Sequence, residues 1–348
     1  MVNATVRGIG TAVPPEMDHT GVWEGFFREH YGNDPTAARL WAGAGITTRH
    51  AAVDPRLEDI SGWSTGQRMR RFVEEAAPLG KEAVGGALAD AGLRPGDVGL
   101  FAVVSCTGYA TPGLDILLAR DVGMADDVQR LHIGHMGCYA AIPGLGAAAD
   151  FVVARGRPAV LLSVELTSLH IQPATGDVGQ MVAHALFADA AAAVVVTPDA
   201  APGGLRVVDV TAVTDVASVD QMTWDVTDLG FRMGLSPRVP DALGRHVRPA
   251  VEGLLSRNGL RVGDVAGWAV HPGGRRIVEV VGERLGLDPA ALAPSYEVLD
   301  GYGNCSSATV LLVLQRLRTS VPLADGAPVV AMAFGPGLTL YAALLVAG

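Results

Sequence analysis

Three side chains of this sequence are of types that together perform acyl transfer. Cys138 stands in "GHMGCYAA", His271 in "AVHPGGRR" and Asn304 in "GYGNCSSA". A cysteine thiolate is a nucleophile that forms thioesters, and a helix N-terminus or a nearby imidazolium stabilises it. A histidine and an asparagine side by side can both donate hydrogen bonds to one oxyanion. The set suits condensation through a thioester, with an enolate or carbonyl oxygen held by His271 and Asn304.

Cys138 taken alone has two other interpretations. A cysteine in a run of glycine and alanine is often a small core residue. His132, His135 and Cys138 recur at every third position, which resembles the spacing of metal ligands, but no further Cys/His pair lies near them. The sequence therefore disfavours a metal site. It leaves both the nucleophile and the core residue open at this point.

An internal repeat indicates how these residues are positioned. The segments "GLRPGDVGLFAV" at 92–103 and "GLRVGDVAGWAV" at 259–270 are identical at eight of twelve positions. An amphipathic helical pattern precedes each segment, and a buried strand ends it. The same offset relates Cys138 to Cys305. Two copies of one α/β unit, 1–205 and 206–348, explain the chain length better than two unrelated domains do.

Apolar strands that alternate with helices predict an α/β fold with largely parallel sheets, covered by helices on both faces. Ligands bind at the carboxyl ends of such strands. The first copy places Cys106 and Cys138 at strand ends, and the second places His271 and Asn304 there. A pseudo-twofold axis between the copies would bring the cysteine, the histidine and the asparagine together.

Composition excludes several classes of function. The chain has 348 residues, of which 49% are hydrophobic and 18% are charged, so we expect several buried layers. The net charge is −10 and no long Lys/Arg cluster is present, so we expect no nucleic-acid partner. Three widely spaced cysteines do not form a disulfide framework, which favours the cytoplasm.

The two ends of the sequence indicate no membrane partner. The N-terminal residues lack the basic and apolar regions of a signal peptide. The C-terminal "PVVAMAFGPGLTLYAALLVAG" is free of charge over 21 residues, but "GPG" at 335–337 divides it into two runs of strand length. We expect two buried strands joined by a turn rather than a transmembrane helix.

The sequence resembles the type III polyketide synthases, the chalcone synthase family within the thiolase fold. The resemblance rests on "GHMGCYAA", "VELTSLH", "HALFADAAAAVVV", "HPGG" and "GYGNCSSA", closed by "FGPGLT". It implies two duplicated α/β halves in a layered αβαβα arrangement. The related ketoacyl-ACP synthase III enzymes share the Cys-His-Asn set but not the pairing of the last two motifs.

The resemblance implies a role for each motif residue. Cys138 matches the nucleophile that carries the starter and the growing chain. His271 and Asn304 match the pair that keeps this cysteine ionised, promotes malonyl decarboxylation and stabilises the enolate. Phe187 matches the phenylalanine at the junction of the coenzyme A tunnel and the active site. Ser306, in "GYGNCSSA", matches a residue of the substrate pocket.

The pocket departs from the chalcone synthase pattern at several positions. The second gatekeeper position falls on Met233, with Phe231 two residues earlier. Of three cavity threonines, Thr167 is kept, while Cys106 and His170 replace the other two. Trp224 replaces a cavity glycine, and Thr111 stands where a methionine reaches into the neighbouring subunit. The resemblance thus predicts a rebuilt substrate pocket. Arg49, in "GITTRH", is a candidate for the coenzyme A phosphates, with a solvated surface arginine as the alternative.

We therefore expect a cytoplasmic, homodimeric enzyme that uses an acyl-CoA starter and malonyl-CoA and needs no cofactor or metal. Its products would be cyclised pyrones or phenols. One alternative is a ketoacyl-ACP synthase III-like enzyme that makes a single extension. Another is a non-catalytic protein of the thiolase fold, which the complete Cys-His-Asn set disfavours.

Overall fold

The computed structural model describes residues 3–348. The strands of its first half are β1 (Thr5–Ala12), β4 (Leu100–Ser105), β5 (Gln129–Gly134), β6 (Ala159–Leu166) and β7 (Asp189–Thr197). Those of its second half are β8 (Leu205–Thr214), β11 (Gly267–Val270), β12 (Pro328–Gly335) and β13 (Thr339–Ala347). Together they form one nine-stranded sheet in the order β11-β12-β13-β8-β1-β7-β6-β4-β5.

The two halves of this sheet repeat one pairing pattern. In the first half, β1 pairs antiparallel with β7, β7 pairs antiparallel with β6, and β6 pairs parallel with β4. In the second half, β8, β13, β12 and β11 follow the same succession of two antiparallel pairings and one parallel pairing. The halves meet where Thr5 pairs with Arg206 and Val6 with Leu205. The internal repeat therefore corresponds to a repeated sheet topology.

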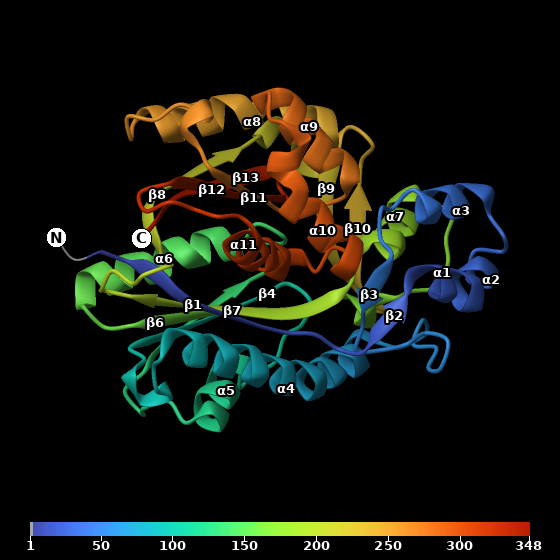
Figure 1. Cartoon of the computed structure of the whole chain (residues 1–348). Coiled ribbons are helices and arrows are strands. Elements are labelled where there is room, and N and C mark those ends of the chain that lie inside the picture. The colour runs from blue at the N-terminus through green and yellow to red at the C-terminus, as the bar shows by residue number, and fades with distance from the viewer. Residues whose placement is uncertain (1–2) are drawn as a thin grey trace.

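Helices lie in three layers around the two half-sheets (Figure 1). The outer helices are α4 (Thr65–Ala91) and α5 (Leu114–Val122) on the first half, and α8 (Val239–Ser256) and α9 (Arg275–Leu285) on the second. The helices α6 (Ala141–Arg155) and α11 (Thr309–Ser320) lie between the halves. The predicted αβαβα layering is confirmed.

The remaining elements form a lobe at one side and the walls of the site. The lobe contains α1 (His19–Val22), a π-helical segment (Trp23–Phe27), α2 (Arg28–His30), α3 (Pro35–Ala42) and the short strands β2 (Glu16–Asp18) and β3 (Thr48–His50). The walls are α7 (Val178–Leu186), α10 (Ala293–Tyr302) and the hairpin of β9 (Met222–Thr227) and β10 (Gly230–Leu235).

Identical turns explain why the repeat is visible in the sequence. Asp97 accepts a hydrogen bond from the backbone N–H of Arg94 over 3.1 Å, and Asp264 accepts one from that of Arg261 over 2.8 Å. Each aspartate thereby closes a short 3-10 turn that leads into a buried strand. Each arginine side chain also forms an ion pair with the aspartate of its turn, over 3.1 Å in the first copy and 3.5 Å in the second, so both residues of the repeated pair contribute to the turn.

Small residues allow the central helices to lie close to the sheets. In α6, a Cβ atom added to Gly144 would come within 2.8 Å of a Leu161 methyl group, so glycine fits best there.

The C-terminal residues form the predicted pair of strands, since β12 and β13 pair antiparallel from Pro328 to Ala347. Within residues 3–348, none of the helices has the length and apolar character needed to cross a bilayer.

Candidate active site

Cys138 lies in the turn between β5 and α6 and is 7% exposed. Gly137 before it has a φ of +79°, which favours glycine. A Cβ atom at Gly137 would also lie 2.4 Å from the ring of Pro336, in the turn between β12 and β13. The "FGPG" motif of the second half therefore packs directly on the turn that carries the cysteine.

His271 follows β11 and is 1% exposed. Its backbone is fixed by a hydrogen bond from its N–H to the Met332 carbonyl oxygen over 2.8 Å. Within residues 3–348, neither ring nitrogen of His271 has a hydrogen-bond partner. Buried polar groups are normally paired, so this imidazole is free to bond a substrate atom or to accept a proton.

Asn304 is held so that its amide nitrogen is available. Its Oδ1 accepts a hydrogen bond from the Ser306 N–H over 2.9 Å, which fixes the direction of the amide. Its Nδ2 donates to the Gly273 carbonyl oxygen over 3.3 Å. The bond to Gly273 accounts for one of the two Nδ2 protons, and the other faces Cys138, where it can bond the sulfur or an oxyanion.

The structure brings these three side chains to one cavity of about 210 Å³, which we call the entry tunnel. Its mouth is formed by α7, α8 and the start of α9. Its other lining residues include Val182, Leu186, Phe187, Met222, Met233, Leu235, Leu243, Gly273, Gly274, Arg276, Ile277 and Phe334. The lining is apolar apart from the reactive groups, Ser236 and Arg276, as expected for a channel that takes an extended thioester arm.

Burial sets the protonation of the resting site. It raises the pKa of the Cys138 thiol to about 12, although hydrogen bonds from Ser306 and Asn304 act in the opposite direction. Burial also lowers the pKa of His271 to about 3. Burial thus acts against the thiolate that the resemblance implies for the resting site. It also favours the neutral form of His271, which can act as a base.

The space behind the thiol is small and is divided by aromatic rings. One cavity of about 10 Å³ is lined by Cys106, Thr107, Gly137, Cys138, Thr167, Phe187, Trp224, Met233, Ser306 and Pro336. A second, of about 30 Å³, is lined by Thr167, His170, Gln172, Gln180, Ala183, His184, Phe187, Trp224, Phe231, Arg232 and Met233. We call these the inner cavity and the side cavity. Trp224 and Phe187 line both, and Met233 lines the entry tunnel as well.

His170 lines the side cavity, but its ring nitrogens are occupied by the backbone. Nδ1 accepts from the Phe231 N–H over 3.0 Å, so Nε2 carries the proton and donates to the Thr107 carbonyl oxygen over 2.7 Å. The ring also stacks on Phe231 with centroids 4.6 Å apart. Burial lowers the pKa of His170 to about 3. His170 therefore forms part of the cavity wall, and both of its ring nitrogens bond backbone groups.

Glu165 is a site residue that the motifs did not single out. It is fully buried, and its carboxylate accepts hydrogen bonds from Thr107 Oγ1 over 2.7 Å, from the Cys106 N–H over 3.0 Å and from Ser307 Oγ. Cys106 Sγ also lies 3.2 Å from Ser306 Oγ. Burial raises the pKa of Glu165. The sequence feature that could have identified Glu165 is its place as the one acidic residue in the apolar strand β6.

Thr111, His132 and His135 do not line these cavities. Thr111 is exposed, and its Oγ1 donates to the Tyr109 hydroxyl group over 3.0 Å. His132 and His135 are exposed while Cys138 is buried, and the described part of the chain holds no cluster of three potential metal ligands.

Arg49 is not at the protein surface, contrary to both interpretations of its sequence. It is 4% exposed, and its guanidinium donates to backbone carbonyl groups at the end of α7. Arg49 lies on β3 and does not line the entry tunnel. Arg49 therefore does not meet the phosphates of coenzyme A.

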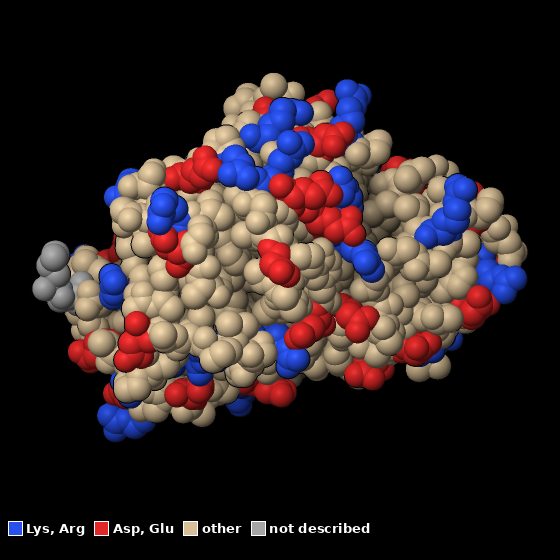
Figure 2. Space-filling model, turned by 45° about the horizontal axis from the view of Figure 1, so that its top comes forward, with Lys and Arg blue, Asp and Glu red and all other residues tan. Residues whose placement is uncertain are grey.

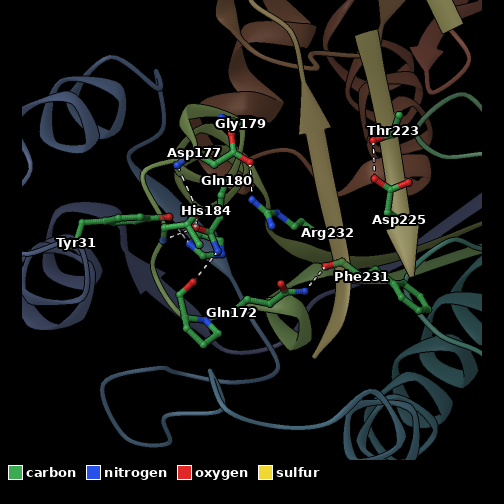
Figure 3. A network of polar contacts seen from close by, with 12 residues as sticks. Tyr31, Gln172, Asp177, Gly179, Gln180, His184, Thr223, Asp225, Phe231 and Arg232 are labelled. Atoms are coloured by element: carbon green, nitrogen blue, oxygen red, sulfur yellow. Dashed lines mark hydrogen bonds and ion pairs between the residues drawn. The ribbon is translucent and has the colours of Figure 1, made fainter. Parts of the chain in front are cut away.

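A polar network closes the outer side of the side cavity (Figure 3). Tyr31 from the lobe bonds His184 Nδ1 over 2.7 Å, and Gln172 donates to the Phe231 carbonyl oxygen over 3.0 Å. Arg232 forms an ion pair of 2.8 Å with Asp177 at the start of α7. The lobe, α7 and β10 are thus tied together around the cavity.

Two comparisons with known proteins agree with this geometry. Residues 2–200 match the family "Chalcone and stilbene synthases, N-terminal domain", and residues 212–347 match the corresponding C-terminal domain. The chain belongs to the chalcone and stilbene synthase family. It is 35% identical to 1,3,6,8-tetrahydroxynaphthalene synthase of Streptomyces peucetius subsp. caesius, over 98% of this chain and 92% of that one.

Further relatives are named as polyketide synthases, which narrows the class of enzyme. The chain is 30% identical to the "Alpha-pyrone synthesis polyketide synthase-like Pks18" of Mycobacterium tuberculosis, over 97% of this chain and 89% of the relative. Among solved structures, the type III polyketide synthase 1,3,6,8-tetrahydroxynaphthalene synthase of Streptomyces coelicolor superposes with a TM-score of 0.92 at 29% identity, over 98% of this chain and 99% of that one. PKS-I of the brown alga Ectocarpus siliculosus gives a TM-score of 0.92 at 29% identity, over 100% of this chain and 99% of that one.

These relatives settle the class of enzyme. The chain is a type III polyketide synthase with the thiolase-like fold that the resemblance implied. The relatives are polyketide synthases, so the ketoacyl-ACP synthase III alternative is not supported. The alternative of a non-catalytic protein is not supported either.

Proposed function

We propose that this type III polyketide synthase loads a short acyl group from coenzyme A onto Cys138, extends it with malonyl-CoA, and releases a cyclised pyrone or phenol. The observation that carries the proposal is the shared wall of the entry tunnel, where Cys138, His271 and Asn304 meet. The ring nitrogens of His271, which have no partner within residues 3–348, and the Nδ2 group of Asn304, which faces Cys138, can supply the polar groups that this chemistry requires.

Loading begins with a neutral thiol. Cys138 Sγ attacks the thioester carbonyl carbon of the starter while His271 takes the thiol proton. The bond from carbon to the coenzyme A sulfur breaks, and the proton passes from His271 to that leaving sulfur. Since burial disfavours each lone charge in this site, the proton transfer and the attack are coupled.

Extension uses the same imidazole in its neutral form. In bound malonyl-CoA the bond to the carboxylate breaks, carbon dioxide leaves, and the electron pair forms an enolate. Hydrogen bonds from His271 and from Asn304 Nδ2 stabilise the enolate oxygen. The enolate carbon then attacks the acyl group on Cys138, which forms the new carbon–carbon bond and frees the thiolate.

The volumes behind Cys138 support a small starter and few extensions. Trp224 lines both the inner cavity of about 10 Å³ and the side cavity of about 30 Å³, together with Thr167, Phe187 and Met233. A rigid aromatic starter needs space that this indole fills. The relatives named for tetrahydroxynaphthalene and α-pyrone synthesis suggest the corresponding ring classes for the product.

Coenzyme A requires a cation near the tunnel mouth, and Arg276 is placed to supply it. Arg276 lines the entry tunnel, is 55% exposed, and pairs with Glu283 over 2.7 Å. We propose that it, rather than Arg49, meets the phosphates. A hollow of about 870 Å³, lined by the neighbouring Arg275, lies between the lobe and the helices α9 and α10, and Figure 2 shows this face indented there.

The same proposal includes the assembly and the setting of the enzyme. We expect a homodimer, because β5 is an edge strand with the exposed Leu131, and an open edge favours pairing with a second copy. We expect division into halves at 1–205 and 206–348, a cytoplasmic location, and catalysis without a cofactor. Light scattering on a sizing column tests the dimer.

Incubation with radiolabelled malonyl-CoA and a panel of acyl-CoA starters tests the reaction. Mass spectrometry of cyclised products with two or more extensions from short-chain starters supports the proposal. Label that appears only in carrier-bound β-ketoacyl products, or no turnover with any starter, overturns it.

A further inference from the structure

One buried arginine and the backbone of Asn304 hold the C-terminal end of α7. The last four carbonyl groups of an α-helix have no partner within the helix. In α7, Arg49 Nη1 donates to the His184 carbonyl oxygen over 2.9 Å, and Arg49 Nη2 donates to that of Ala185. The Asn304 N–H donates to the Leu186 carbonyl oxygen over 2.9 Å.

The same guanidinium reaches the residue that follows the helix. Arg49 Nη1 donates to the Phe187 carbonyl oxygen over 3.2 Å. Phe187 in turn forms a parallel bridge with Asn304, closed by a bond of 2.9 Å from the Ala188 N–H to the Asn304 carbonyl oxygen. Arg49 therefore fixes the backbone that carries Phe187 and runs beside Asn304.

The surroundings of Arg49 keep its side chain in one place. Its Nη2 also bonds His19 Nδ1 over 3.0 Å, and its guanidinium carbon lies 4.9 Å from the centre of the Trp41 ring. His19 Nε2 donates to the Trp41 carbonyl oxygen over 3.1 Å. Burial lowers the pKa of Arg49 only to about 10, so it is a cation at neutral pH.

Burying a cation destabilises the folded state unless hydrogen bonds or opposite charges compensate for its lost hydration. The carbonyl groups at a helix C-terminus carry partial negative charge and favour a cation there. Arg49 finds its acceptors in these carbonyl groups rather than in a carboxylate. Its location ties it to a helix end that borders the entry tunnel.

We propose that Arg49 is a positioning residue: by holding the end of α7 it sets the place of Phe187 in the tunnel and the position of Asn304 beside His271. The inference rests on the proposed function, because it assigns Arg49 an effect on decarboxylation and on acyl loading. Arg49 acts through these neighbours and touches no reacting atom.

Arg68 provides a matched control. It is likewise fully buried, and it donates to the carbonyl oxygens of Trp63, Leu169, Ile60 and Ser61. These acceptors belong to the loop before α4 and to the turn after β6, not to the end of α7. The arginines therefore resemble each other in burial and bonding but differ in what they hold.

The experiment compares Arg49→Met, Arg49→Lys and Arg68→Met in the full chain. It measures malonyl-CoA decarboxylation and acylation of Cys138 by a short-chain acyl-CoA, each per folded molecule, and the melting temperature. We expect Arg49→Met to lower the decarboxylation kcat at least 10-fold and to raise KM for the starter. Arg49→Lys keeps the charge but not the fork that reaches three carbonyl groups, so its kcat and KM should lie between those of Arg49→Met and the unmodified enzyme. Arg68→Met should lower the melting temperature but keep decarboxylation within about 2-fold.

Equal decarboxylation per folded molecule in the Met variants of Arg49 and Arg68 would show that Arg49 only stabilises the fold. If Arg49→Met does not fold, Arg49→Lys decides: a shift in KM or kcat at an unchanged folded fraction supports positioning, and wild-type values of both overturn it. Failure of the proposed function is separate, since the unmodified enzyme would then show neither decarboxylation nor acylation.

Discussion

Trp224 Nε1 donates a hydrogen bond of 2.7 Å to the carbonyl oxygen of Cys106, which holds the indole between the inner cavity and the side cavity. The bond joins the β9 strand to the end of β4, so it also fixes the hairpin over the site. The indole edge lies near His170, with ring centroids 5.6 Å apart. The indole is the largest of the four side chains that line both cavities, the others being Thr167, Phe187 and Met233.

Replacing Trp224 should change the size of the product. Trp224→Gly joins the two cavities, so we expect bulkier starters to be accepted and the number of extensions to rise. Trp224→Phe keeps most of the volume and loses only the hydrogen bond, so its products should resemble those of the unmodified enzyme. Mass spectrometry of products from one starter panel measures both variants.

The stability cost of Trp224→Gly should stay below the roughly 3–5 kcal/mol typical of a fully buried aromatic ring, because the indole is half-buried. Urea unfolding measures it. An unchanged product profile in Trp224→Gly would contradict the role of the indole as a partition.

His170→Gln should make the enzyme less sensitive to acid. Folding holds His170 neutral with a pKa of about 3, while in the unfolded chain its pKa is near 6.5. Below pH 6.5 the unfolded chain therefore binds a proton that the native state does not, so stability falls as pH falls. Glutamine can keep both backbone bonds, to the Phe231 N–H and the Thr107 carbonyl oxygen, without this titration.

The measurement is the difference in unfolding free energy between His170→Gln and the unmodified enzyme at pH 8, 6 and 5. From its value at pH 8, the difference should move in favour of the variant by about 1.4 kcal/mol for each pH unit below 6.5. A difference that does not change with pH would mean that His170 binds a proton in the folded state.

The sequence predicted the architecture because repeats and strand patterns are local. The duplicated turn, the apolar strands and the Gly-Pro-Gly turn each carry their signal within a dozen residues. Symmetry then sufficed to bring Cys138, His271 and Asn304 together. The position of Trp224 in the cavity followed from the resemblance, which matches it to a cavity glycine of chalcone synthase.

Burial and long-range packing were not visible in the same way. Arg49 was expected near the tunnel mouth because its charge is apparent in the sequence, whereas its acceptors are backbone groups 135 to 138 positions away. The direction of the Cys138 pKa depends on how fully the turn is buried, which no motif records. Glu165 gathers its partners from β4 and from the turn before α11, so only the fold reveals that cluster.

Iodoacetamide should label Cys138 before the other cysteines, but only slowly at neutral pH. Its pKa of about 12 keeps the thiol protonated, so the rate should rise with pH through pH 9 without a plateau. Cys106 and Cys305 have their pKa values raised further by burial, and they do not line the entry tunnel. Peptide mapping at pH 6, 7.5 and 9 gives the order; rapid labelling of Cys138 at pH 6 would instead demonstrate a resting thiolate paired with His271.

Cys138→Ala and Asn304→Ala should separate the two halves of the reaction. Cys138→Ala removes the atom that carries the chain, so no polyketide should form, while His271 and Asn304 still hold the enolate and decarboxylation continues. Asn304→Ala removes the Nδ2 donor, and loss of one oxyanion donor typically lowers kcat by about 10²-fold or more. Because the backbone bonds of residue 304 to Leu186 and Ala188 do not involve the side chain, the end of α7 should stay in place.

Release of labelled carbon dioxide from malonyl-CoA measures decarboxylation, and intact-protein mass measures acylation. Full-length polyketide from Cys138→Ala would show that another group is the nucleophile, and decarboxylation by Asn304→Ala within a few-fold of the unmodified rate would show that His271 alone stabilises the enolate.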